Sequence, residues 1–268
     1  GQGTIPVRRG VAAVDFGRDE VRRLLAASKE IPLTTFDVVT TYAEKHWESH
    51  AKRCVETFQA YWKDIPLRAY TDEELEDASD WLPEFKQRQR GRPTDNYRFD
   101  AVRFSHKVAA IEQAFRVGTA DCLIWLDADC VTHADVEAGW LASLIGNADF
   151  GYLKRANKYP ECGFLILRRN ERVAEFIQHL VWLYRTDELF ELAEWHDSWA
   201  IEHVRSYMER IDRLRCVSLS GGFEHTGHPF VNGPLGARLD HCKGNRKQAG
   251  RSKASDLKVQ RREDHWRG

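Results

Sequence analysis

The sequence predicts an α/β fold in which helices flank a mostly parallel sheet within a single domain. Three observations carry this prediction. A β-branched run at 36–41 leads directly into an amphipathic helical pattern at 46–62 and then into a second short strand at 67–70. A later apolar run, at 123–126, has the unbroken hydrophobicity of a strand buried on both faces. Because strand, helix and strand follow one another, we expect parallel pairing through a right-handed crossover.

The remaining elements follow in chain order. Residues 1–33 are expected to form an extension with one helix, at 18–29, and the polar stretch 73–96 is typical of a surface excursion. A helix at 100–117 then leads into the apolar strand. The later expected elements are strands at 150–153 and 163–167 and helices at 173–185 and 198–211.

Two finer predictions concern the ends of these later elements. A turn at Tyr159–Cys162 is expected between the two strands, and Asp197 or Ser198 is expected to cap the last helix. Residues 248–268 lose all periodicity, which indicates a basic C-terminal tail.

Composition indicates a globular chain. Of its 268 residues, 42% are hydrophobic and nine are Trp, which argues against disorder. No apolar run approaches the roughly 20 residues of a membrane helix. The six cysteines have neither a close pair nor a framework spacing, so we expect reduced thiols and a cytoplasmic location.

The net charge of −1 hides an uneven distribution. Residues 243–268 contain nine Lys or Arg against three acids, and residues 86–103 contain six against two. Such basic blocks suit phosphate-rich partners, although a solvated face or a loose tail has the same composition.

Two carboxylates, Asp127 and Asp129, stand where the apolar strand leaves the sheet. This is the edge at which α/β folds bind ligands. The two acids repel each other unless a cation lies between them. Mg²⁺ or Mn²⁺ would offset this repulsion and would also bind a diphosphate. The alternative is a strand end with two solvated acids.

With Lys107 upstream and His241–Lys247 downstream, this Asp-x-Asp strand resembles the GT-A glycosyltransferases, and more narrowly the glycogenin and LgtC-like group with its later His-x-x-Gly-x-x-Lys. The motifs and their order match across about residues 36–247, which implies a GT-A domain at 34–247. In that group the first Asp also meets the ribose, the second Asp and the His hold Mn²⁺, and the last Lys reaches a phosphate. The resemblance assigns these roles to Asp127, Asp129, His241 and Lys247.

The chemistry of these residues suits departure of a diphosphate, because the developing charge must be met by a metal and by cations. Asp127, Asp129 and His241 are therefore the candidate metal ligands. Around the phosphates we expect Lys243, Arg246 and Lys247, with Gly244 allowing close approach of the backbone. Lys107 and Arg103, one turn apart, are expected to reach the donor, unless they form an exposed helix face.

Further candidates lie at the other strand ends. Thr40, Thr41 and Tyr42 end the first strand, where the resembling family binds uracil, and Tyr42 is a candidate to stack on a base. Asp72 follows the second strand. Each can equally be an ordinary polar strand end.

The resemblance also implies roles for Asp197, beside the donor sugar, and for Glu161, facing the acceptor. If the anomeric configuration is retained, the departing phosphate can take the acceptor proton and no dedicated base is needed. If it is inverted, Asp197 or Glu161 is the candidate base.

The acceptor is the least constrained part of the prediction. Residues 228–236 look similar to small bacterial and phage glycosyltransferases, some of whose relatives act on hydroxymethylated pyrimidines in DNA. The basic blocks favour double-stranded DNA, from which the base would be flipped out. A carbohydrate or cell-surface glycan explains the core motifs equally well. UDP and glucose are the donor components that the resemblance implies.

Two other classes remain open. The Asp127-x-Asp129 strand also looks like the first motif of haloacid-dehalogenase phosphatases, in which the first Asp is the nucleophile. However, more than a hundred residues precede it here, and no later strand with paired acids is evident. The third reading is a non-catalytic nucleic-acid-binding protein, which leaves the pairing of Asp127 and Asp129 with His241 and Lys247 unexplained.

Overall fold

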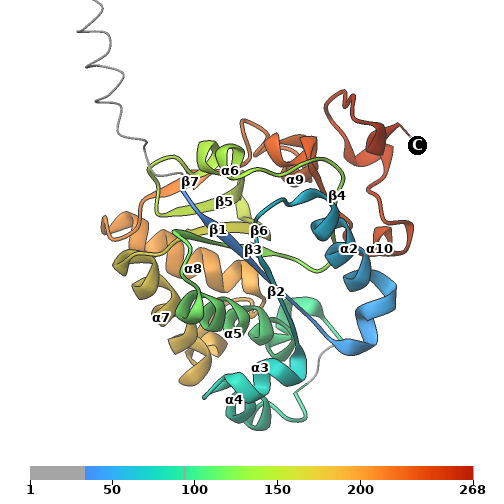
Figure 1. Cartoon of the computed structure of the whole chain (residues 1–268). Helices are drawn as coiled ribbons and strands as arrows, with labels where there is room; N and C mark the ends of the chain where they lie inside the picture. The colour runs from blue at the N-terminus through green and yellow to red at the C-terminus, as the bar shows by residue number, and fades with distance from the viewer. Residues whose placement is uncertain (1–33, 93–94, 268) are drawn as a thin grey trace, which may run out of the picture. The chain divides into compact units, whose positions relative to one another are not determined.

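The computed structural model describes residues 34–92 and 95–267, so the helix expected at 18–29 lies outside the described residues. A six-stranded sheet is its central element, with the strands in the order β2-β1-β3-β6-β5-β7 (Figure 1). The bounds of these strands are β1 Phe36–Tyr42, β2 Leu67–Thr71, β3 Cys122–Leu126, β5 Phe150–Arg155, β6 Lys158–Arg168 and β7 Cys216–Ser218. Only β6 runs against its neighbours, and the other adjacent pairs are parallel. The predicted α/β class with a mostly parallel sheet is therefore confirmed.

The β1–helix–β2 unit forms as predicted, with one difference at the start of its helix. A 3-10 turn at Glu44–His46 and a π turn at Trp47–Ala51 precede α2, Lys52–Tyr61. Cys54 and Phe58 of α2 are buried against the sheet. The irregular turns bring the segment after β1 around the carboxyl end of the sheet.

The expectation of a surface excursion at 73–96 was wrong. The segment contains two helices, α3 Asp72–Ala78 and α4 Leu82–Arg88, and Leu75, Leu82 and Phe85 are fully buried. Each helix has only seven residues, and its polar exposed residues outnumber its buried apolar ones. The average composition of the segment is therefore polar. A capping box on Thr71 starts α3.

Helices cover both faces of the sheet (Figure 1). One face packs against α3, α4, α5 Ala101–Val117, α7 Glu171–Arg185 and α8 Asp197–Arg210, and the other against α2, α6 Ala138–Ile145 and α9 Pro229–Asn232. Strand β3 contributes to both cores, because Leu123 and Trp125 point to the first face while Ile124 points to the second. The unbroken apolar run of this strand follows from burial on both sides.

Strands β5 and β6 form a hairpin, and here the predicted turn was misplaced. Tyr159–Cys162 belongs to β6, and the hairpin turns at Ala156–Asn157, where Asn157 has φ 56°. The helices predicted at 173–185 and 198–211 are confirmed as α7 and α8. The residue at the N-cap of α8 is His196, so Asp197 is the first helical residue rather than the cap.

The segment after Lys247 packs on the domain in spite of its lack of period. It includes the end of α10, Arg246–Ala249, and 3-10 turns at 254–256 and 264–266. Asp240 accepts hydrogen bonds from the Ser252 hydroxyl at 2.6 Å and contacts His265 Nε2 at 2.9 Å. Across the described ranges, no helix combines the length and the hydrophobicity needed to span a membrane.

Candidate functional site

A second, two-stranded sheet assembles the candidate site. After β3 the chain turns through Asp127–Asp129 into β4, Cys130–Thr132, which pairs antiparallel with β8, Leu239–His241. In this register Cys130 lies opposite His241. The pairing therefore brings a histidine from near the end of the chain beside the two carboxylates.

Three predicted metal ligands converge at this point. His241 Nε2 lies 3.1 Å from Asp129 Oδ1 and 3.4 Å from Asp127 Oδ2. Two carboxylates and an imidazole are a donor set that fits Mn²⁺, and the carboxylates also suit Mg²⁺. The residues present thus fit a hard divalent cation.

Cys130 is also within reach of this cluster, since ligand atoms of Asp129, Cys130 and His241 lie within 4.8 Å of one another. However, the Cys130 thiol is buried and donates to the Gly163 carbonyl at 3.7 Å. Burial raises its pKa well above the usual value for a thiol. A protonated thiol is a poor ligand for a hard cation, so the oxygen donors of Asp127 and Asp129 fit better.

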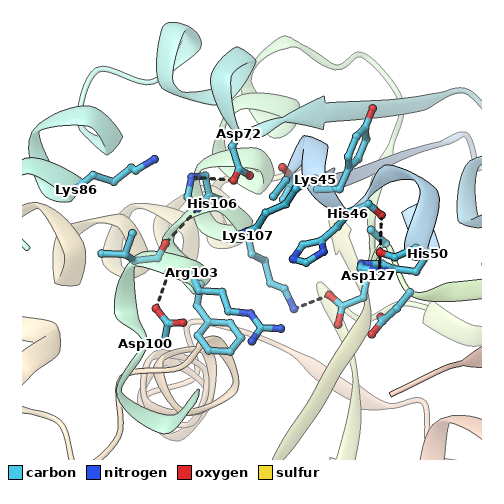
Figure 2. Close-up of a pocket in the computed structure, with 18 of the residues that line it drawn as sticks. Lys45, His46, His50, Asp72, Lys86, Asp100, Arg103, His106, Lys107 and Asp127 are labelled. Atoms are coloured by element: carbon cyan, nitrogen blue, oxygen red, sulfur yellow. Dashed lines mark hydrogen bonds and ion pairs between the residues drawn. The ribbon is translucent and has the colours of Figure 1, made fainter. Parts of the chain in front are cut away.

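Lys107 reaches Asp127 from α5 (Figure 2). Its Nζ lies 2.8 Å from Asp127 Oδ1, donates to the Cys162 carbonyl at 2.9 Å and pairs with Asp197. The side chain is buried, so the alternative of an exposed helix face is wrong for this residue. Burial lowers the pKa of Lys107, but Asp127 and Asp197 outweigh burial and leave it raised, so the ammonium stays charged.

The downstream motif divides between two cavities. Lys247 Nζ lies 2.9 Å from Asp129 Oδ2, and Gly244, with φ 57°, permits the turn that brings Lys247 back to the acids. Lys243 and Arg246 instead line a smaller neighbouring cavity of about 290 Å³. Arg246 donates from Nε to Asp256 at 2.6 Å, and its place beside the donor phosphates stays a prediction.

The main cavity, of about 1380 Å³, opens beside the two carboxylates at the carboxyl ends of β1 and β3. Most predicted donor-binding residues line it: Thr41, Tyr42, Asp72, Arg103, Lys107, Asp127, Asp129, Gly244 and Lys247. Thr40 does not, because its side chain is fully buried in the sheet. The cavity therefore brings the ends of β1 and β3 and the downstream motif together.

Several residues of this cavity were missed by the sequence reasoning. Lys45, His46 and His50 come from the turns after β1, and Lys86 and Arg92 come from α4 and the loop after it. Figure 2 shows His46 and His50 facing the cavity near Asp127. The spacing of His46 and His50, four residues apart and directly after a strand, was the signal available.

The two imidazoles, of His46 and His50, differ in charge from the lysine and arginine side chains around them. Burial and the nearby Lys247 ammonium lower the pKa of His50 to about 4, and burial with Lys45 lowers that of His46. Both rings are therefore neutral at pH 7 and can accept as well as donate hydrogen bonds.

The predicted base-stacking residue already has an aromatic neighbour. The Tyr42 and Trp47 ring centroids are 5.2 Å apart, with the rings inclined at 38°. Asp72 faces His106, whose Nε2 lies 3.9 Å from the carboxylate. These contacts fix one wall of the cavity without filling it.

Neither predicted catalytic acid lines the cavity. Asp197 is buried against Lys107, and Glu161 is buried in β6, not in a loop, with its Oε1 3.0 Å from His241 Nδ1 and 2.7 Å from Lys243 Nζ. Burial raises the pKa of both acids, but the neighbouring cations outweigh it and hold both below their usual range. Both acids are therefore ionised and weakly basic at neutral pH.

No protein-family model and no curated protein sequence matches the chain. Among solved structures, it is similar to a glycosyltransferase involved in the glycosylation of the major capsid of PBCV-1, with a TM-score of 0.49, 12% identity, 80% of this chain covered and 99% of that one. It is also similar to the glycosyltransferase GlyE of Streptococcus pneumoniae, with a TM-score of 0.43, 14% identity and coverage of 71% and 47%. The bifunctional WbbM has a TM-score of 0.43, 15% identity and coverage of 70% and 39%. The chain thus spans less than half of the last two, and likenesses this distant assign no activity by themselves.

Proposed function

We propose that this chain is a metal-dependent glycosyltransferase that moves a sugar from a nucleotide-sugar donor to a hydroxyl acceptor. The observation that carries the proposal is the convergence of Asp127, Asp129 and His241 at one end of a large cavity. Lys107 and Lys247 pair with the same acids and face the same space. Such a set of oxygen, nitrogen and ammonium groups suits a diphosphate held with a divalent ion.

When bound, the Mn²⁺ or Mg²⁺ ion supplies Lewis-acid stabilisation of the departing diphosphate. Asp127, Asp129 and His241 are the residues that would hold it. Lys107 and Lys247 add fixed positive charge where negative charge develops, and Lys107 cannot move away readily because Asp197 and the Cys162 carbonyl hold its ammonium.

The environment of Asp197 bears on the stereochemical course. A base works best with a pKa near the operating pH. Burial raises the pKa of Asp197, but the Lys107 ammonium outweighs burial and leaves this pKa lowered. This supports Asp197 as the group that orients Lys107, and it favours a retaining reaction in which the departing phosphate takes the acceptor proton.

The donor and the acceptor are finer proposals. By resemblance we propose UDP-glucose as the donor, with Tyr42 and Thr41 at the base end of the cavity. We propose hydroxymethylated pyrimidine in double-stranded DNA as the first acceptor to test, because Arg90, Arg92 and Arg103 give the cavity a basic side. A carbohydrate acceptor is the alternative outcome of the same screen.

A thermal-shift panel tests the donor site. The purified protein is heated with UDP, GDP, ADP and representative nucleotide sugars, each with and without Mn²⁺. We expect one nucleotide to stabilise only with metal, by about 2.7 kcal/mol at a hundred times its Kd. Asp129→Ala should abolish the effect, and Asp135→Ala, an exposed acid paired with Lys63, should keep it.

The outcomes separate the functional classes. A metal-dependent response to one nucleotide leads to an acceptor screen with hydroxymethylated DNA, unmodified DNA and oligosaccharides. The absence of any such response would refute the donor site. A phosphatase assay of the wild type and Asp127→Asn would then test the haloacid-dehalogenase alternative, and DNA binding alone would favour the non-catalytic one.

A further inference from the structure

Glu161 is a buried carboxylate that the proposed reaction does not use. It is 3% exposed and lies in the interior of β6, between apolar stretches of the sheet. Its Oε1 is 2.7 Å from Lys243 Nζ, 3.0 Å from His241 Nδ1 and 3.2 Å from His228 Nδ1. Burying a carboxylate is costly, so three nitrogen partners on one oxygen call for an explanation.

The His241 ring lies between Glu161 and the carboxylates of Asp127 and Asp129. Its Nδ1 faces Glu161, while its Nε2 faces Asp129 and Asp127. The ring packs closely against the backbone of Gly163, where a Cβ would lie 2.4 Å from Nδ1 and from Cε1. The ring is therefore confined to one orientation, in which Nδ1 faces Glu161 and Nε2 faces Asp127 and Asp129.

We propose that Glu161 is a positioning residue for the metal site. By accepting the Nδ1–H of His241, it would leave the Nε2 lone pair free to bind a metal together with the carboxylates of Asp127 and Asp129. Lys243 Nζ, 2.7 Å from the same Glu161 oxygen, neutralises the carboxylate charge. This inference rests on the proposed metal site.

The backbone around Glu161 supports the same role. His228 Nε2 lies 3.2 Å from the His241 carbonyl oxygen, so the residue that contacts the carboxylate with its Nδ1 also holds the main chain of the ligand. Residues from β6, from β8 and from the segment before α9 therefore converge on the orientation of one imidazole. A carboxylate needed only for folding would not have to face a metal ligand.

The test is a titration of Mn²⁺ into the full chain, followed by the electron paramagnetic resonance signal of the free ion, with and without UDP. Glu161→Met keeps the length of the side chain but removes the acceptor, and we expect it to weaken Mn²⁺ binding about 10- to 100-fold. Glu161→Gln keeps an acceptor oxygen, and we expect it to restore part of the loss. Asp149→Asn is the matched control, because Asp149, directly before β5, is a fully buried carboxylate that pairs with Arg215, directly before β7.

The outcomes distinguish failure of the proposed metal site from failure of the proposed role of Glu161. If the wild type does not bind Mn²⁺, the proposed metal site fails, and the inference fails with it. If the wild type binds but both Glu161 variants bind equally well, only the role of Glu161 is refuted. An equal loss of affinity in Asp149→Asn would show a general effect of destabilisation and would also overturn the inference. If Glu161→Met does not fold, Glu161→Gln decides alone, with an affinity several-fold below the wild type expected.

Discussion

Gly163 offers the sharpest test of the geometry at His241. A Cβ at this position would lie 2.4 Å from the His241 Nδ1 and Cε1 atoms and 3.1 Å from Nε2. Ordinary contacts start at 3.4 Å, so Gly163→Ala forces the ring to move by about 1 Å, the difference between these two distances. The ring cannot swing freely, because it is buried and both of its nitrogens have partners.

The displacement has two expected costs. Overpacking a well-filled interior typically costs about 1–3 kcal/mol of folding stability. A shift of about 1 Å in a catalytic group costs roughly 100-fold in rate. We therefore expect Gly163→Ala to fold with a lowered melting temperature, to bind Mn²⁺ more weakly and to lose about two orders of magnitude in sugar transfer or donor hydrolysis.

The assay combines thermal unfolding, Mn²⁺ titration and turnover. Gly151→Ala in β5 is the matched control, since its added Cβ would meet only apolar side-chain atoms, at 3.2–3.4 Å. It should change stability without changing Mn²⁺ affinity. A Gly163→Ala protein that is folded and binds Mn²⁺ as tightly as the wild type would refute the assignment of His241 as a fixed ligand.

Three further predictions follow from the charges. Burial lowers the pKa of His241, but Asp129 outweighs burial and leaves this pKa raised, so binding of a metal at Nε2 must release a proton. Mn²⁺ affinity should therefore rise with pH by up to about tenfold per unit between pH 6 and 8. A flat profile would contradict this. Lys107→Met leaves buried acids unpaired and should cost about 3–5 kcal/mol in urea unfolding, partly recovered by Mn²⁺; unchanged stability would contradict the buried pair. Burial raises the pKa of Asp149, but hydrogen bonds from its arginine partner lower it to about 2, a depressed folded-state value. Its contribution of about 2 kcal/mol should thus be present above pH 4 and lost as the pH falls to 2, so the stabilities of the wild type and Asp149→Asn should converge there.

The elements that could be predicted from the sequence are those with a strong period or a continuous apolar run. Strands β1 and β3 and helices α5 and α7 belong to this group. The carboxylates could be found because they directly follow such a strand, and the downstream histidine could be found only by resemblance. Helices α3 and α4 were missed because seven residues give too short a pattern.

The pairing of the site residues could not be read from local patterns. Strands β4 and β8 have three residues each, so neither shows a period, yet their register alone brings His241 beside Asp129. Arg246 and Lys247 are adjacent in the chain but line different cavities, because the short helix α10 points them in different directions. Glu161 was assigned to a loop because the hairpin turn was expected three residues too late.

The short sheet of β4 and β8 joins residues that are far apart in the sequence. Asp129 and His241 are 112 positions apart, and the Ser252 and His265 contacts that hold Asp240 beside His241 come from still further along the sequence. Asp127 and Asp129 have His241 and Lys247 as partners only when β8 is paired with β4. Opening of the short β4–β8 pair would therefore remove His241 and Lys247 from both acids together, so the whole arrangement depends on three residue pairs.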